Sequence, residues 1–309
     1  MSYAYLLAGE NLDLAEAELR GYLKSQDIEE RLKRNQRLVE TQAEPEQLKR
    51  LALTHEISKI KEKSNSRKFN PSYIPEKSYE VRVENLTSKE IDKKDLEAFY
   101  GDKLSSDKNT VDLENPNETV KIYVLEERVV LGVLIEDIDR GLFDKRKNQN
   151  RPFSSPISLD PVLARVMVNL SETKPGNFLL DPFCGTGGIL IEAGLCGIGV
   201  KGLDISEEMV EGTRENLEEY GIIAHDIEQG SIENLFDNFL GDYESIVTDL
   251  PYGKASKEIE DPVEEFLDKI QSIEDKKIVF MYNEPKLRDY SHEFEVYVHK
   301  NLTRYIYVI

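Results

Sequence analysis

The spacing of apolar and polar residues is most regular after residue 177. There, short apolar runs alternate with segments in which apolar residues recur at helical spacing. The runs that can form strands are residues 177–182, 199–204, 223–229, 244–249 and 277–282. The amphipathic segments between them are residues 188–196, 206–220, 232–240 and 257–272. This alternation predicts an α/β domain with a parallel, doubly wound sheet.

The C-terminal end follows a different pattern. Residues 293–298 and 303–308 are strand-like runs joined by a short turn at Lys300–Leu302. They predict an antiparallel hairpin beside the parallel sheet. Such an ending is unusual for a dehydrogenase.

The N-terminal half is less regular. Strand-like runs occupy residues 3–9, 37–41, 79–83, 111–113, 120–124 and 129–135. Helical patterns occupy residues 12–26, 45–55 and 88–105, whereas residues 56–63 fit either a helix or a strand. We expect a small α+β assembly of two subdomains, residues 1–63 and 64–138.

The segment 139–158 is charged at first and then rich in Asn and Pro, which indicates a linker. The domain that follows, residues 159–309, opens with an amphipathic helix over 159–170. We expect residues 151–309 to fold alone, because their core is self-contained.

Composition argues against a membrane, secreted, disulfide-rich or metal-binding protein. No apolar run approaches the ~18 residues of a membrane span, and the N-terminus lacks the basic region of a signal peptide. Cys184 and Cys196 are too few for a disulfide framework, and the four histidines are dispersed. We therefore expect a cytoplasmic protein without a membrane or metal partner. The oligomeric state stays open, with a monomer favoured.

The net charge of −20 is uneven, because −16 of it falls on residues 151–309. An acidic protein binds nucleic acid poorly unless it has local basic patches. Two segments supply basic residues that could bind RNA: Lys59, Lys61, Lys63, Arg67 and Lys68, and Lys145, Arg146, Lys147 and Arg151. The alternative for each segment is a solvated surface loop.

The stretch Asp181–Gly188 lies between a short apolar run and a helical one, which indicates strand, glycine turn and helix. It matches neither Gly-x-Gly-x-x-Gly nor a phosphate-binding loop, and Asp181 would repel a pyrophosphate. A cationic ligand is favoured: S-adenosylmethionine carries an ammonium, which suits Asp181, and a sulfonium. Asp204 ends the next strand, 23 residues later, where a carboxylate can hold ribose hydroxyls. The alternative is a glycine turn that only lets the helix pack closely.

A third strand end carries Asp249-Leu250-Pro251-Tyr252. Methylating an exocyclic amine is difficult because its lone pair is delocalised into the ring. A carboxylate from Asp249 and a carbonyl from Leu250 could accept the two amine hydrogens and favour the pyramidal nitrogen of the transition state. Pro251 would fix the turn, and Tyr252 would offer a face on which a base can stack. The alternative is a simple turn with a core tyrosine.

Residues 181–193, Asp-Pro-Phe-Cys-Gly-Thr-Gly-Gly-Ile-Leu-Ile-Glu-Ala, together with 151–153 and 163–170, closely resemble the THUMP-domain tRNA guanine-N2-methyltransferases. The similarity is best to the archaeal enzymes that act on guanosine at tRNA position 10, and residues 5–11 and 111–116 share it. The resemblance implies a class I (Rossmann-like) methyltransferase domain that uses S-adenosylmethionine. It also implies a ferredoxin-like and THUMP-like N-terminal half that binds tRNA. We expect residues 151–309 to bind S-adenosylmethionine without this N-terminal half.

The motifs and the resemblance together predict two sets of site residues. The cofactor-binding set is Asp181, Pro182, Phe183, Cys184, Gly185, Thr186, Gly187, Asp204, Ile205, Ser231 and Ile232. The catalytic set is Asp249, Leu250, Pro251 and Tyr252.

Two positions depart from the family pattern. Leu250 stands where the family usually has the first proline of Asp-Pro-Pro-Tyr, so we expect Leu250→Pro to be tolerated if the Leu250 amide makes no needed hydrogen bond. Ser231 stands where the family tends to have a carboxylate that contacts adenine. Two other functions stay open: an N6-adenine methyltransferase, and a non-catalytic tRNA-binding protein with a vestigial pocket.

Overall fold

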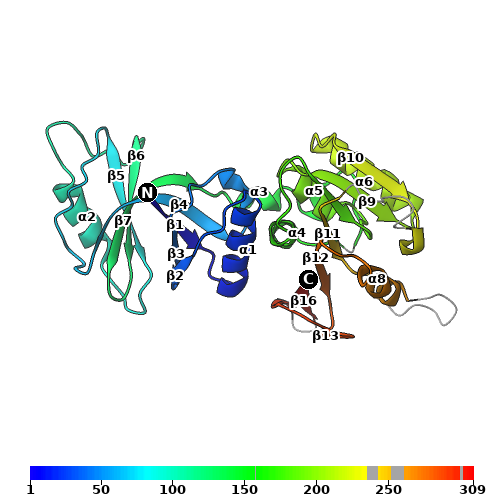
Figure 1. Cartoon of the computed structure of the whole chain (residues 1–309). Helices are drawn as coiled ribbons and strands as arrows, with labels where there is room; N and C mark the ends of the chain where they lie inside the picture. Colours follow the sequence, from blue (N-terminus) through cyan, green and yellow to red (C-terminus); the bar gives the residue numbers. More distant parts are fainter. Residues whose placement is uncertain (157, 235–242, 252–260, 300–301) are drawn as a thin grey trace. The chain divides into compact units, whose positions relative to one another are not determined.

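The computed structural model describes the chain except residues 157, 235–242, 252–260 and 300–301. The chain forms two compact units, each described by itself below (Figure 1). The first unit comprises Met1–Glu16, Ile28–Lys49 and Leu53–Asp139. The second comprises Ala17–Asp27, Arg50–Ala52 and Arg140–Ile309.

A seven-stranded sheet organises the first unit, in the order β2-β3-β1-β4-β7-β6-β5. Its strands are β1 Ser2–Leu7, β2 Lys33–Asn35, β3 Leu38–Thr41, β4 Thr54–Ser64, β5 Tyr79–Asn85, β6 Glu118–Val124 and β7 Val129–Asp137. Only β5 and β6 pair in parallel among these strands. Because β4 pairs with β7, one sheet spans the two subdomains expected at 1–63 and 64–138.

The helix α2, Lys93–Lys103, packs against β5 and buries Leu96 and Tyr100. Asp92 caps it by accepting a hydrogen bond from the Asp95 amide, which satisfies one free donor of the first turn. The expectation of a strand at 111–113 was wrong, since Val111 makes only an isolated bridge with Tyr79.

The segment 45–55 was also wrongly expected to be a helix. It holds only the short 3₁₀ turn η1, Leu48–Arg50, before β4 begins at Thr54. Leu51, Ala52 and Leu53 are buried there, so their apolar spacing reflects packing of an irregular segment. The ambiguous residues 56–63 belong to β4.

The second unit has a seven-stranded sheet in the order β10-β9-β8-β11-β12-β16-β15. The strands are β8 Phe178–Asp181, β9 Gly199–Asp204, β10 His225–Gln229, β11 Ser245–Asp249, β12 Lys277–Tyr282, β15 Phe294–His299 and β16 Leu302–Val308. The first five in that order pair in parallel, and β16 and β15 are antiparallel. The predicted doubly wound sheet and terminal hairpin are confirmed; Lys300 and Asn301 of the expected turn lie outside the described residues.

Some helices of this unit begin at a capping side chain and others do not. The helices are α3 Gly141–Asp144, α4 Pro161–Leu170, α5 Gly188–Gly194, α6 Glu207–Glu219 and α8 Pro262–Ile270, with 3₁₀ turns η2 Asn148–Asn150 and η3 Ile232–Asn234. Asp160 and Asp261 each cap a helix whose first residue is proline, a favourable pair at a helix start. Two short strands, β13 Lys286–Leu287 and β14 Tyr290–Ser291, pair with each other. The expected helices 232–240 and 257–272 fall partly on residues that the structure does not describe.

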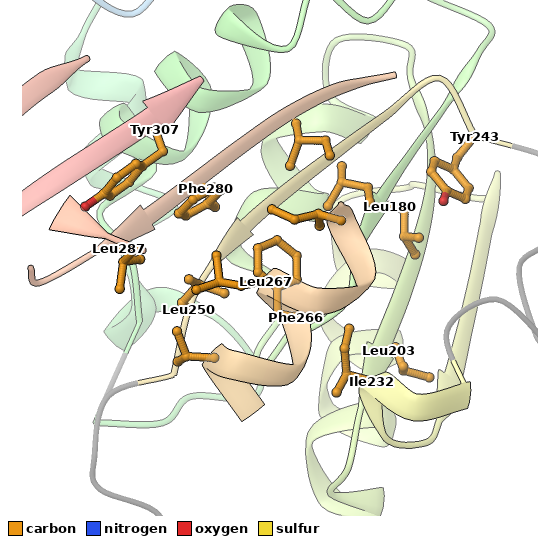
Figure 2. Close-up of a cluster of buried hydrophobic side chains, with 14 residues drawn as sticks. Leu180, Leu203, Ile232, Tyr243, Leu250, Phe266, Leu267, Phe280, Leu287 and Tyr307 are labelled. Atoms are coloured by element: carbon orange, nitrogen blue, oxygen red, sulfur yellow. The ribbon is translucent and has the colours of Figure 1, made fainter. Parts of the chain in front are cut away.

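A buried apolar cluster holds α8 on the sheet (Figure 2). Phe266 of α8 lies edge-on to Phe280 of β12, with ring centroids 5.5 Å apart. Phe280 in turn stacks on Tyr307 of β16 at 4.6 Å, so the antiparallel hairpin shares this core. Leu250, which follows β11, belongs to the same cluster and is fully buried.

The N-terminal chain contributes directly to the second unit, through the later turns of α1, Leu12–Lys24, and through Arg50. The Asn169 side chain of α4 donates to Glu18 Oε1 at 2.8 Å and accepts from Arg50 Nε at 2.8 Å. A Cβ at Gly21 would collide with the Asn169 carbonyl, so α1 and α4 are in close contact. The expectation of a self-contained core in residues 151–309 was therefore wrong.

The segment 139–158 carries structure of its own. Phe143 of α3 is buried, and Arg146 pairs with the buried Glu192 of α5. In the part of the chain that the structure describes, no helix combines the length and apolarity needed to cross a bilayer.

Candidate functional site

A cavity of about 570 Å³ opens at the carboxyl ends of β8, β9 and β11. We call it the strand-end cavity. Three predicted carboxylates, Asp181, Asp204 and Asp249, line it together. The remaining lining residues are Ser155, Ser158, Leu159, Pro182, Phe183, Cys184, Gly185, Thr186, Gly188, Ile189, Ile205, Met209, Gly230, Ser231, Ile232, Glu233, Leu250, Pro251, Pro262 and Glu265. Every predicted cofactor-binding or catalytic residue that the structure describes lies there except Gly187, whose neighbours on both sides line the cavity.

The glycine turn after β8 depends on left-handed backbone. Gly185 has φ 52° and Gly187 has φ 77°, a region that side-chain-bearing residues rarely adopt. A Cβ at Gly187 would lie 2.9 Å from Thr213 Cγ2 of α6. The hydroxyl of Thr213 donates to the Gly185 carbonyl at 2.6 Å, which fixes the turn against that helix.

Asp181 is almost fully buried beneath this turn. Its Oδ1 accepts hydrogen bonds from Thr248 Oγ1 at 2.7 Å and from the Phe183 amide at 3.1 Å. Burial is the main cause that raises the pKa of Asp181 to about 7, and the charges of Asp249 and Asp204 act in the same direction. An acid in this position gains most from a cationic ligand, because such a ligand stabilises the ionised form.

Asp204 connects the end of β9 to both neighbouring loops. Its Oδ2 accepts from the Gly185 amide and its Oδ1 from the Ser206 amide, both at 2.9 Å. Each carboxylate oxygen has a further lone pair for a ligand hydroxyl. Ile205 beside it lines the cavity and is 75% exposed, which leaves apolar surface next to a carboxylate.

Asp249 ends β11 and forms an ion pair with Arg304 of β16. Burial raises the pKa of Asp249 to about 6, while the Arg304 guanidinium acts in the opposite direction.

The amide of the next residue, Leu250, donates to the Met281 carbonyl at 3.0 Å. The condition attached to Leu250→Pro therefore fails, and the expectation that this change is tolerated was wrong. Pro251 lines the cavity, and Tyr252 lies outside the described residues.

The acidic lining of the cavity determines which kind of ligand it favours. Asp181, Asp204, Glu233, Asp249 and Glu265 line it, and its described lining contains no Lys or Arg. Such a site disfavours a phosphorylated nucleotide and favours a cation. S-adenosylmethionine fits, because it combines two positive groups with a ribose and an aromatic base whose faces can pack on apolar side chains. Among the residues that the structure describes, no group of three or more His, Cys, Asp or Glu is arranged to hold a metal ion.

Comparison with known proteins agrees with this interpretation of the cavity. A family model described as UPF0020, RMKL-like methyltransferase domain, matches residues 148–289. The tRNA (guanine(10)-N2)-dimethyltransferase of Methanothermobacter thermautotrophicus is 37% identical over 291 residues, which cover 88% of this chain and 85% of that protein. The protein of the same name from Methanocaldococcus jannaschii is 35% identical over 253 residues, covering 77% and 72%. This chain belongs to the tRNA (guanine(10)-N2)-dimethyltransferase family. It is a methyltransferase whose methyl donor is S-adenosylmethionine.

A solved structure supports the fold. TrmN from Thermus thermophilus matches with a TM-score of 0.54 and 19% sequence identity, covering 100% of this chain and 99% of that chain. At this identity the match concerns the fold alone.

The second basic segment is only partly available for RNA. Lys145 is exposed, and Lys147 pairs with Asp144 at 2.6 Å. Arg146 instead bonds the buried Glu192, and Arg151 is only 5% exposed. The Arg151 guanidinium donates to the Arg146 carbonyl and to Ser158 Oγ. Both arginines therefore face inward, because buried acceptors in this unit attract them.

The first basic segment lies in the other unit. Lys59, Lys61 and Lys63 lie on β4, but its register with β7 shifts between Ile60 and Glu62, so simple alternation does not place all three on one face. Lys61 lies over the Tyr73 ring at 4.7 Å, Lys63 pairs with Glu40, and Lys68 pairs with Asp95 at 2.7 Å. Arg67 is exposed. Most of these cations thus already have intramolecular partners, and their role in RNA binding stays a proposal.

Sequence reasoning missed several cavity residues. Glu233 and Glu265 enter from η3 and α8, segments whose spacing indicated only helices. Ser158 lies in the segment that was expected to be a linker. Only the place of Glu233 in the sequence could have indicated its role: it follows the end of the third parallel strand, where such sheets bind ligands.

Proposed function

We propose that this protein transfers methyl groups from S-adenosylmethionine to the exocyclic N2 amine of the guanosine at tRNA position 10. One observation supports it most: Asp249 and Leu250, at the end of β11, open onto the same cavity as Asp181 and Asp204. Amine-binding and cofactor-binding groups thus share one enclosed space. The names of the family members cited above support the tRNA substrate and the addition of two methyl groups.

Different cavity residues would bind different parts of the cofactor. Asp181 accepts the ammonium group, Asp204 accepts the ribose hydroxyls, and the side chains of Ile205 and Ile232 pack on the adenine ring. The backbone of Pro182–Gly187 and the Ser231 hydroxyl complete the contacts. The bound cofactor supplies an electrophilic methyl group on a sulfonium.

The protein's own contribution to the chemistry is made at the amine. Because the pKa of Asp249 is about 6, its carboxylate is mostly ionised at neutral pH and accepts one amine hydrogen. The Leu250 carbonyl accepts the other. Two acceptors on one side of the nitrogen direct its lone pair to the opposite side, which stabilises the pyramidal transition state more than the flat ground state. Pro251 and Tyr252 hold the base against the site.

Delivery of the tRNA is a separate task. The base must leave its local stack to enter the cavity, at a cost of a few kcal/mol. Phosphate contacts elsewhere on the tRNA supply that energy without reading sequence. The proposed phosphate contacts are Lys59, Lys61, Lys63, Arg67, Lys68, Lys145 and Lys147. Arg146 and Arg151 would stabilise the segment that carries Lys145 and Lys147.

Mass spectrometry of digested tRNA tests the proposal. Unmodified transcripts with guanosine or adenosine at position 10 are incubated with the full-length protein and S-adenosylmethionine. We expect N2-methylguanosine followed by N2,N2-dimethylguanosine, from the guanosine transcript alone. Methyladenosine as the product would replace this proposal by an N6-adenine methyltransferase, and cofactor binding without any methylated nucleoside would indicate a non-catalytic tRNA-binding protein.

A further inference from the structure

Arg304 is bonded to both oxygens of the proposed catalytic carboxylate. One terminal nitrogen, Nη1, lies 2.7 Å from Asp249 Oδ1 and 2.9 Å from Asp249 Oδ2. Both side chains are mostly buried, with 12% of Arg304 and 16% of Asp249 exposed. The cation therefore bridges the two carboxylate oxygens instead of binding one of them from solvent.

The strand order explains how two residues 55 positions apart meet. The strand β12 pairs in parallel with β11 and antiparallel with β16, so it lies between Asp249 and Arg304. Met281 is opposite Asp249 on one side and Ile306 on the other. Arg304 is two residues before Ile306 and thus lies toward the carboxyl end of β12, next to the strand-end cavity.

A bridging cation has a geometric consequence. It holds both oxygens of Asp249 within 2.9 Å of one atom, which restricts how far the carboxylate can move. An amine that must present its hydrogens to Asp249 and to Leu250 at once needs such a fixed acceptor.

A second consequence is electrostatic. Acidic groups of several neighbouring elements line the same cavity as Asp249: Asp181 of β8, Asp204 of β9, Glu233 of η3 and Glu265 of α8, whereas Tyr282 of β12 and Tyr305 of β16 pack against the apolar cluster. Most of these groups are acidic, and burial adds to the cost of a charge on Asp249. The guanidinium counters both effects, in agreement with the direction in which it acts on the pKa of Asp249.

We propose that Arg304 is a positioning residue for methyl transfer, which holds the Asp249 carboxylate in place and keeps it charged. This inference rests on the proposed function of Asp249 and extends it to the terminal hairpin. It gives β16 a catalytic purpose beyond closing the sheet.

The test compares Arg304→Met and Arg304→Lys with the wild-type protein. Arg288→Met is the matched control, since Arg288 also forms ion pairs, with Glu264 and Asp268, but neither of these carboxylates lines the cavity. Single-turnover methyl transfer to tRNA is measured across pH 5.5 to 9, together with calorimetry of S-adenosylmethionine binding and thermal unfolding.

We expect the Arg304→Met rate at pH 7 to fall about 10²-fold, the scale of a misplaced reacting group. Its rate profile should also shift to higher pH, because Asp249 loses its counter-charge. The affinity for S-adenosylmethionine should stay within about two-fold, Arg304→Lys should restore part of the rate, and Arg288→Met should behave as wild type.

Two results would overturn the inference. One is an unchanged rate and pH profile in folded Arg304→Met or, if that variant does not fold, in Arg304→Lys. The other is a lower rate with an unshifted profile and an equal loss of cofactor affinity, which would indicate a structural role. Since the wild-type protein is measured alongside, inactivity of the wild type would instead refute the proposed function.

Discussion

The Gly185 amide donates to Asp204 Oδ2 at 2.9 Å, so the carboxylate that ends β9 also holds the glycine turn that follows β8. Two of the three predicted strand ends are thereby joined before any ligand binds. A ligand that enters the strand-end cavity meets a site whose loops are already fixed, which lowers the entropy cost of binding.

We expect Asp204→Ala to weaken S-adenosylmethionine binding by about 1.5–3 kcal/mol, the value of hydrogen bonds to a charged group. Calorimetry measures the loss. Asp204→Asn is the matched control: it keeps one acceptor for the Gly185 amide but no charge, and should lose less. Wild-type affinity in Asp204→Ala would place the ribose contact elsewhere.

We expect Leu250→Pro to destabilise the protein by about 1–3 kcal/mol, because the buried Met281 carbonyl loses its donor. The loss of a fully buried leucine side chain adds to this cost. Urea unfolding measures it. Leu250→Met keeps the amide and nearly the volume, and should cost less than ~1.5 kcal/mol. Equal stability of the proline variant and the wild type would contradict the hydrogen bond.

The pH dependence of stability reports on Asp181. Its pKa, raised by burial to about 7, exceeds the ordinary value in an unfolded chain, so folding favours the protonated acid. The resulting stabilisation is complete below about pH 4 and is lost as the pH rises through about 7. Between pH 6 and 8, the ligand-free wild type should lose roughly 1–1.5 kcal/mol more than Asp181→Asn. Parallel pH dependences for the two proteins, from urea unfolding, would show that Asp181 is already ionised at pH 6.

We expect the double change Lys145→Glu and Lys147→Glu to weaken tRNA binding. The slope of log K against log salt should become less steep by about 0.9 for each duplex phosphate that the protein no longer neutralises. Arg146 is left intact because it neutralises the buried Glu192. Filter binding at several salt concentrations measures both effects, with Lys286→Glu, which changes the net charge half as much, as a control at another exposed site. An unchanged slope would remove this segment from the tRNA interface.

Local spacing predicted the second sheet well because each parallel strand is a short, nearly continuous apolar run between amphipathic helices. Residues 199–204 and 277–282 match their strands end to end. Asp181, Asp204 and Asp249 could be placed together because parallel strands present their carboxyl ends at one edge.

Long-range contacts could not be predicted in this way. Nothing near Asp249 in the sequence indicates Arg304, and nothing near Asn169 indicates Arg50 or Glu18. The Leu250 amide bond to Met281 depends on the register between β11 and β12, which apolar runs do not specify. The inward turn of Arg146 likewise depends on Glu192, a residue of another helix.

The proposed mechanism depends most on Asp249 as the acceptor of an amine hydrogen. The most direct measurement is the single-turnover rate of methyl transfer to tRNA by Asp249→Asn at saturating S-adenosylmethionine. Asparagine preserves the shape but removes the charge, so we expect a fall of about 10²–10³-fold. Cofactor affinity should stay within a few-fold, because Asp249 is assigned to the amine and not to the cofactor. A wild-type rate in folded Asp249→Asn would contradict the mechanism.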